Sequence, residues 1–183
     1  MAIRGICGKP LRLTTVIANK PIIPEGTYVE KHQFYHYTCR YLIERISWLC
    51  RDFRPMVPEG DGRVKLVFSR RRTMNYQDFQ NYMHVLQNAD TEIHWPVIDI
   101  PGIEAHDHGN RYGLQLADLV TSGLMAALEP DYYGNVEPRF ARSLKPRVYC
   151  RNGNYMSYGT KMFPPADQLQ LSAEQKEFVQ IFG

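Results

Sequence analysis

The sequence predicts an α/β protein, in which helices cover a mainly parallel or mixed sheet. Short segments rich in β-branched residues alternate with longer segments whose apolar residues recur every three or four positions, the period of an α-helix. The core order is therefore strand, helix, strand, helix, strand, helix, with right-handed crossovers between parallel strands. Because ligands of such sheets bind beyond the carboxyl ends of the strands, those ends are the first places to look for a site.

The first part of the chain predicts two short strands and a long helix. Residues 2–7 and Leu11–Ala18 have strand-like composition and are separated by a turn. A helix is expected from about Tyr28 to Phe53, and it must stop before Pro55. Its apolar face contains Tyr35, Cys39, Leu42, Ile46, Leu49 and Phe53.

The middle of the chain predicts a strand, a helix and a further strand. Arg63–Ser69 (RVKLVFS) has the apolar centre and β-branched content of a short buried strand. Asn75 is placed to cap the next helix, in which Asp78 occupies the third position. The segment Glu92–Ile100 is expected to be a strand that Pro96 confines to a sheet edge or a bulge.

Two helices and a tight turn are expected next. A helix over Arg111–Leu128 must end near Pro130, and a shorter helix is expected near Pro138–Leu144. The dipeptide Asn152-Gly153 is typical of the two-residue turn of a β-hairpin.

The carboxyl-terminal segment predicts one more helix. Ser172 and Gln175 form a capping-box pattern at the start of an amphipathic segment, Ala173–Phe182. With 183 residues, the chain has the length of one ordinary domain. We therefore expect a single α/β domain over residues 1–166 and a helical tail over residues 167–183.

Composition limits the class of protein. Apolar residues make up 44% and charged residues 22%, the balance of a soluble globular protein, and no apolar run approaches the roughly 20 residues that cross a bilayer. The first residues lack the apolar segment of a secretory signal, so a cytoplasmic protein without membrane partners is expected. Four scattered cysteines without paired spacing suit a reducing compartment. The net charge of +3 is compatible with a polyanionic partner.

A carboxylate interrupts the apolar helix LQLADLVTSG. Steps of four, three and four place Arg111, Gln115, Asp118 and Ser122 on one polar stripe of a helix otherwise made for burial. A buried ionised carboxylate is costly unless it is paired, hydrogen-bonded or bound to a metal. Asp118 is therefore expected either to accept hydrogen bonds, from Arg111, a loop amide or the arginines after Ser69, or to bind Mg²⁺ or Mn²⁺. Asp99 is the candidate second carboxylate.

Several segments resemble a known family. VKLVFSRRR, the strand containing Asp99, GLQLADLVTSG and YGTKMFP look like the carboxyl-terminal two thirds of domain-of-unknown-function family 3800, which is placed in the ribonuclease H-like fold. The most specific piece is Gln115–Val120, and the resemblance spans most of residues 11–163. It implies a ribonuclease H-like mixed sheet flanked by helices, shortened at its amino terminus because the family's opening strand has no counterpart.

The resemblance also implies a chemistry. Ribonuclease H-like nucleases gather carboxylates around two metal ions to hydrolyse phosphodiesters. The family pattern carries over to Asp118, with Gln115 beside it, and to Asp99 as a further metal ligand. Ser69 stands where similar proteins tend to carry an aspartate. Glu44 is a third catalytic candidate if its helix packs on both sides, and otherwise it is a solvated residue paired with Arg40 or Arg51.

Basic residues are expected near the same edge of the sheet. Arg70, Arg71 and Arg72 follow a strand directly, and guanidinium groups suit bidentate phosphate contacts. The alternative is a solvated turn. Lys20, Arg111 and Gln115 are the other candidate nucleic-acid ligands.

Two histidine groups are candidate zinc ligands. They are His106-Asp107-His108, which is alternatively a polar loop, and the pair His32 and His36, which is alternatively a helix surface.

The sequence thus predicts a metal-dependent nuclease of ribonuclease H-like type, using Mg²⁺ or Mn²⁺ and shortened or degenerate in this chain. The alternative is a non-catalytic nucleic-acid-binding or assembly subunit that retains the fold. Either predicts nucleic acid as partner, and an open sheet edge predicts a homo-oligomer or a second chain that completes the sheet.

Overall fold

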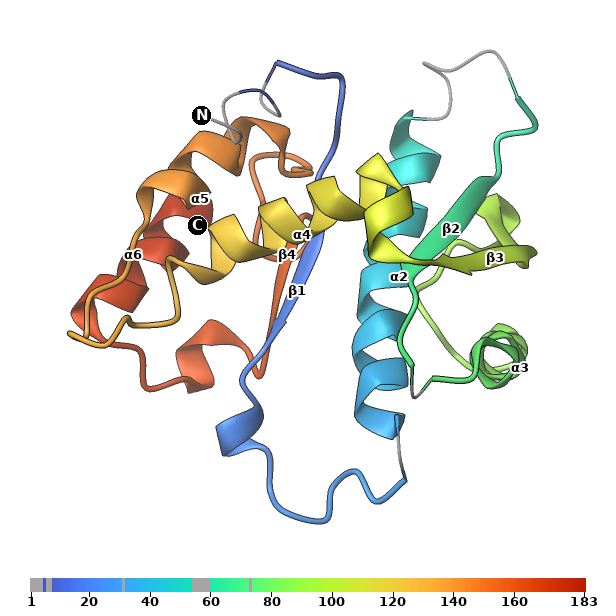
Figure 1. Cartoon of the computed structure of the whole chain (residues 1–183), viewed down its shortest axis with the longest axis horizontal. Coiled ribbons are helices and arrows are strands. Elements are labelled where there is room, and N and C mark those ends of the chain that lie inside the picture. Colours follow the sequence, from blue (N-terminus) through green and yellow to red (C-terminus); the bar gives the residue numbers. More distant parts are fainter. Residues whose placement is uncertain (1–4, 6–7, 31, 54–59, 73) are drawn as a thin grey trace. The chain divides into compact units, whose positions relative to one another are not determined.

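The computed structural model describes residue 5 and residues 8–30, 32–53, 60–72 and 74–183 (Figure 1). The described residues divide into two compact units, which are treated separately. Unit 1 is drawn from residues 1–23 and 115–183, and unit 2 is drawn from residues 24–114. The chain is α/β, as predicted, and the single domain over residues 1–166 stays a prediction.

Unit 1 is built on a short parallel ladder. Strand β1, Thr15–Ala18, pairs with β4, Thr160–Phe163, so that Thr15 lies opposite Thr160. Helices α4 (Tyr112–Met125, whose first residues belong to unit 2), α5 (Arg139–Leu144) and α6 (Ala173–Phe182) supply most of the remaining regular structure. They bury one apolar cluster, which consists of Ile17, Val120, Leu124, Ala127, Leu128, Ala141, Leu144, Val148, Met162, Phe178, Ile181 and Phe182.

The carboxyl-terminal helix is part of this core. The Ser172 hydroxyl accepts a hydrogen bond from the Gln175 amide, and the Gln175 side chain accepts one from the Ser172 amide, which confirms the predicted capping box. Phe178 and Phe182 are completely buried. The helix that the sequence predicts as a tail therefore packs into unit 1.

The predicted turn at Asn152-Gly153 is also present. Arg151 and Asn154 form an isolated antiparallel bridge, and Asn152 and Gly153 both have positive φ angles, of 52° and 80°. A tight hairpin turn of this kind needs positive φ at both central residues, which Asn and Gly tolerate.

Unit 2 contains a second parallel ladder with its own core. Strand β2, Val64–Ser69, pairs with β3, Ile98–His106, and helices α2 (Gln33–Phe53) and α3 (Tyr76–Gln87) complete the unit. Asn75 caps α3 as predicted, because its side chain accepts a hydrogen bond from the Gln77 amide. The buried cluster comprises Cys39, Ile43, Leu66, Met74, Phe79, Met83, Leu86, Ile93, Val97, Ile98, Ile100 and Ile103.

The strand predicted at Glu92–Ile100 is misplaced. Pro96 lies in a 3₁₀ turn, Trp95–Val97, and the strand begins at Ile98 and continues to His106. Proline fixes φ and has no amide hydrogen for a ladder, so it belongs to the turn before the strand. The register then shifts, since Lys65 lies opposite Asp99 whereas Val67 lies opposite Glu104. The extra residues of β3 form a bulge that contains Pro101.

Two further expectations can be compared with the described residues. Both ladders are parallel, but within this part of the chain they are two two-stranded sheets rather than one, each over its own core. The strand predicted at residues 2–7 falls, apart from Gly5, outside the described residues. None of the described helices has the length and apolar character that crossing a bilayer requires.

Candidate functional site

The carboxyl ends of β2 and β3 meet at one edge of unit 2. Ser69 lies opposite His106 at the ends of the two strands, and the Arg70 amide donates to the His106 carbonyl at 2.8 Å. Arg70, Arg71 and Arg72 therefore leave the ladder where parallel sheets place their ligands, as predicted.

Tyr76 from α3 holds the arginine turn in place. Its hydroxyl donates to the Ser69 carbonyl at 2.9 Å and accepts from the Arg71 amide at 3.1 Å. The Arg71 guanidinium carbon lies 4.7 Å from the centre of the Tyr35 ring, a cation–π distance. One arginine of the turn is thus oriented by an aromatic side chain.

Arg70 is tied only loosely to the end of β3. Its Nη2 donates to the Ala105 carbonyl at 3.2 Å, and its Nε lies 3.8 Å from the Asp107 carboxylate. Both charged side chains are more than half exposed. Exposed ion pairs of this kind contribute about 0–1 kcal/mol, so Asp107 is an easily replaced partner.

A chain of charged contacts lies beside the turn. Glu104 accepts from Lys65, and its Oε2 lies 2.8 Å from His106 Nε2. His106 Nε2 is also 3.2 Å from an Arg111 nitrogen. This ring atom donates to Glu104 when it carries a proton and accepts from Arg111 when it does not. Lys65 and His106 together hold the pKa of Glu104 down, at about 2.

We call the five cationic side chains here the basic edge: Lys65, Arg70, Arg71, Arg72 and Arg111. Among the residues that the structure describes, Glu104 and Asp107 are carboxylates in contact with them. Positive charge is therefore in excess. The three arginines of the turn and Arg111 are exposed, so the guanidinium groups are accessible to an anion.

The depressed pKa of Glu104 predicts a titration result. In wild type, ¹³C NMR of the carboxyl group should give a pKa of about 2. Because the folded pKa lies below the unfolded value of about 4.3, the stabilisation is fully present above that value and is lost as pH falls toward 2. Lys65→Met should raise the pKa of Glu104. The control is Glu137, whose pKa Arg139 holds at about 2, and this pKa should not change in Lys65→Met. An unchanged pKa of Glu104 in Lys65→Met would show that Lys65 is not its partner.

Asp118 is not buried. It is exposed on α4, as are Gln115 and Ser122 of the same stripe, because the helix buries Leu114, Val120 and Leu124 on another side. The expectation that Asp118 needs a partner because it is buried is therefore wrong. Its role as a metal ligand stays a prediction that rests on the family resemblance alone.

Asp99 is at the other end of the ladder from the arginine turn. It is the second residue of β3 and lies opposite Lys65 near the start of β2, not near the end of a strand. Its carboxylate oxygen lies 3.4 Å from an Arg63 nitrogen. The misplacement follows from Pro96, which delays the start of the strand to Ile98.

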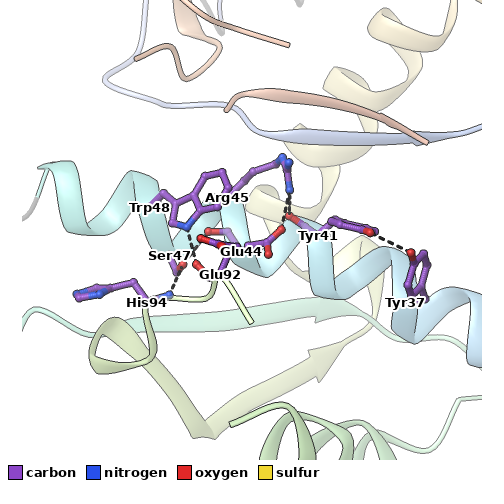
Figure 2. Close-up of polar contacts among 8 residues, drawn as sticks. All are labelled: Tyr37, Tyr41, Glu44, Arg45, Ser47, Trp48, Glu92 and His94. Atoms are coloured by element: carbon purple, nitrogen blue, oxygen red, sulfur yellow. Dashed lines mark hydrogen bonds and ion pairs between the residues drawn. The ribbon is translucent and has the colours of Figure 1, made fainter. Parts of the chain in front are cut away.

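Glu44 is buried, and the arginine that it contacts is its neighbour Arg45 (Figure 2). Its Oε2 lies 3.1 Å from Arg45 Nη1, and both side chains are about 5% exposed. The expectation of a solvated glutamate is wrong. Arg45 also donates to the Tyr41 carbonyl at 2.9 Å and lies 5.2 Å from the centre of the Trp48 ring.

The predicted site residues are divided between the units. Lys20, Gln115 and Asp118 belong to unit 1, and the others belong to unit 2. Unit 2 gathers Arg70, Arg71 and Arg111 at the basic edge, but Asp99 and Glu44 each face an arginine of their own. Among the described residues, no three His, Cys, Asp or Glu side chains are placed to hold a metal ion. Asp118 and Asp99 belong to different units, so the Mg²⁺ or Mn²⁺ site stays a prediction, and we derive no step through it.

Sequence reasoning missed Lys65, Glu104 and His106 as members of the site. Glu104 and His106 are two positions apart on β3, so they lie on the same face of the strand. The spacing of Glu104 and His106 is visible in the sequence, but it places the two residues on one face only if the strand extends to His106, and the predicted strand ended at Ile100.

Comparison of the chain with protein-family models, with curated proteins and with solved structures gave no match. The resemblance to family 3800, and with it the ribonuclease H-like fold, therefore gains no support from them and stays a prediction.

Proposed function

We propose that this chain binds nucleic acid through its phosphates, and that the basic edge of unit 2 is the binding surface. The observation that supports the proposal is the gathering of cationic side chains beside the carboxyl ends of two parallel strands. Arg70, Arg71 and Arg72 directly follow β2, Arg111 contacts His106, and Lys65 reaches Glu104 from nearer the start of β2. This corresponds to the non-catalytic binding alternative that the sequence left open.

The guanidinium groups of the edge are able to bind phosphate. A guanidinium group donates two parallel hydrogen bonds to a phosphate, and such charge-assisted bonds are about twice as strong as neutral ones. Arg70 reaches Asp107 only at 3.8 Å, whereas Tyr76 and Tyr35 hold the turn and Arg71 in position. A phosphate can replace Asp107 without disturbing the structure that supports the turn.

A metal-dependent nuclease of ribonuclease H-like type would act on the same ligand. Such an activity would require carboxylates beyond those that the described residues bring together, supplied by another chain. Incubation of the complex with Mg²⁺ or Mn²⁺ tests it, because product that disappears in Asp118→Asn would favour catalysis. The homo-oligomer or partner chain stays a prediction of the sequence.

The binding proposal predicts a salt-dependent affinity. For wild type, the logarithm of the association constant for a single-stranded oligonucleotide should fall linearly with the logarithm of salt concentration, by about 0.7 per phosphate contact. Arg70→Ala/Arg72→Ala should weaken binding about tenfold at about 50 mM salt and reduce the slope by about 1.4. Fluorescence anisotropy at several salt concentrations measures both quantities.

The matched control removes two arginines from elsewhere in the chain. Arg51→Ala/Arg139→Ala changes the net charge equally, and both side chains pair with their own carboxylates, Arg139 exposed and Arg51 partly exposed. It should retain the wild-type slope. Equal slopes in all three proteins, or binding insensitive to salt, would contradict the proposal.

A further inference from the structure

A cavity of about 490 Å³ lies in unit 2 between the amino-terminal part of α2 and helix α3. Its volume falls within the range of about 300–1,000 Å³ that is usual for small-molecule sites. Tyr28, His36, Tyr37 and Tyr82 supply aromatic walls, and Asn75 and Asp78 supply polar groups from α3 and its cap. The combination is that of a site for a flat ligand with polar edges.

The aromatic walls are arranged in pairs. The His36 ring stacks on Tyr82 with 5.1 Å between ring centres and 22° between planes, and Tyr28 lies 5.7 Å from Tyr37. Burial, followed by the neighbouring His32, lowers the pKa of His36, whereas Asp78 acts in the opposite direction; the net shift favours the uncharged ring. Uncharged rings of this kind stack on nucleobases.

The polar groups supply both kinds of hydrogen-bonding capacity. The Gln33 oxygen accepts from the Val29 and Glu30 amides, and the Asn75 oxygen accepts from the Gln77 amide. What these two side chains offer a ligand is therefore their NH₂ donors. Asp78 is exposed and offers only acceptors. Every base can meet these groups, because adenine, cytosine and guanine present an amino donor beside a ring acceptor, and thymine and uracil present the ring N3–H donor beside carbonyl acceptors.

The cavity adjoins the basic edge. Asn75, which lines the cavity, is three residues after Arg72. Neighbouring side chains also connect Arg71 to the cavity. Arg71 lies 4.7 Å from the centre of Tyr35, and Tyr35 lies 6.4 Å from His36, which lines the cavity. A phosphate on the arginine turn is therefore close to a place for its own base.

The backbone is unusual at the same place. His32, which lines the cavity, has a φ of 74°, and positive φ is uncommon for residues other than glycine. Strained residues of this kind cluster at ligand sites.

We infer that the cavity accepts one unpaired base of a strand whose phosphates lie on the basic edge. The ligand class is then single-stranded nucleic acid, because a base in a duplex is stacked and paired and cannot enter. The inference rests on the proposed function of the basic edge, and it adds the conformation of the ligand.

An oligomer without bases tests the inference. Wild type should bind a deoxycytidine oligomer at least about fivefold more tightly than an abasic oligomer of equal length, which has the same phosphates but no base to stack. A ratio near one in wild type would overturn the cavity inference.

A variant tests the stacking wall. Tyr82→Leu should weaken binding of the deoxycytidine oligomer at least about fivefold, the lower range for one base stacked on an aromatic ring, with an unchanged salt slope. Tyr132→Leu, at a tyrosine that is 95% exposed in unit 1, is the control and should bind like wild type. Wild-type affinity in Tyr82→Leu, while Arg70→Ala/Arg72→Ala still lowers the salt slope, would overturn the cavity inference and leave the basic edge standing. If binding by wild type did not depend on salt concentration, the proposed function itself would be contradicted.

Discussion

Arg45→Ala is expected to lower the free energy of unfolding by about 3–5 kcal/mol, because it leaves the Glu44 carboxylate buried without its partner. Glu44 and Arg45 are neighbours in the sequence and form a buried ion pair at 3.1 Å (Figure 2). Arg45 also donates to the Tyr41 carbonyl and packs against the Trp48 ring. The expected loss is a large part of the 5–15 kcal/mol that stabilises a typical domain.

Tryptophan fluorescence during urea unfolding measures this loss where it occurs. Trp48 and Trp95 are the two tryptophans of the chain, and both belong to unit 2. Arg51→Ala is the control on the same helix, since its pair with Asp52 is partly exposed and should be worth about 0–1 kcal/mol.

A double variant separates the loss of the ion pair from the cost of leaving one charge buried without a partner. Glu44→Gln/Arg45→Met leaves no buried charge and should recover much of the stability lost in Arg45→Ala. Equal losses in Arg45→Ala and Arg51→Ala would show that the ion pair is not buried as described.

Gly159→Ala is expected to destabilise unit 1 by about 3 kcal/mol, the upper part of the usual range for overpacking. A Cβ atom at Gly159 would lie 2.1 Å from the Tyr149 carbonyl oxygen and 2.8 Å from its amide nitrogen. Backbone atoms cannot rotate away as a side chain can. The Gly159 carbonyl also accepts from the Thr15 amide at 2.8 Å, so a displaced Gly159 disturbs the start of β1.

Gly102→Ala provides a comparison with an equally short contact. A Cβ atom there would meet the Asp99 carboxylate at 2.1 Å, but this side chain is about one third exposed and can move. It should cost less than about 1 kcal/mol. Amide hydrogen exchange in β1 and β4 measures the effect of Gly159→Ala. Unchanged protection there would contradict the close packing of Gly159 against Tyr149.

Local signals in the sequence were enough for several elements. The capping box at Ser172, the cap at Asn75 and the turn at Asn152-Gly153 each depend on side chains within three or four residues, and the structure contains all three. The arginine turn was found in the same way, because it follows a strand whose residues could be recognised individually.

The face that a helix buries depends on the rest of the fold. α2 buries Ser47, Glu44 and Arg45, which no hydrophobic pattern would select, whereas α4 leaves Leu116 and Ala117 exposed beside Asp118. Periodicity shows that a helix has an apolar side, but it does not show how much of that side another element covers.

The contact between Lys65 and Glu104, beside the arginine turn, was hidden by strand register. Lys65 meets Glu104, rather than the residue that a regular ladder would supply, because β3 bulges around Pro101. Neither the bulge nor the start of β3 after Pro96 follows from local composition. Because Pro96 precedes β3 rather than lying in it, Asp99 is at the start of the strand and Glu104 lies closer to its end.

The order of the units along the chain has a consequence for folding kinetics. Thr15 of β1 and Thr160 of β4 are 145 positions apart, whereas Val64 and Ile98, which pair in unit 2, are 34 apart. Pairing over a longer loop loses more chain entropy and is slower. Unit 2 is therefore expected to fold first. During synthesis, β1 leaves the ribosome early and must wait without its ladder partner until β4 has been made.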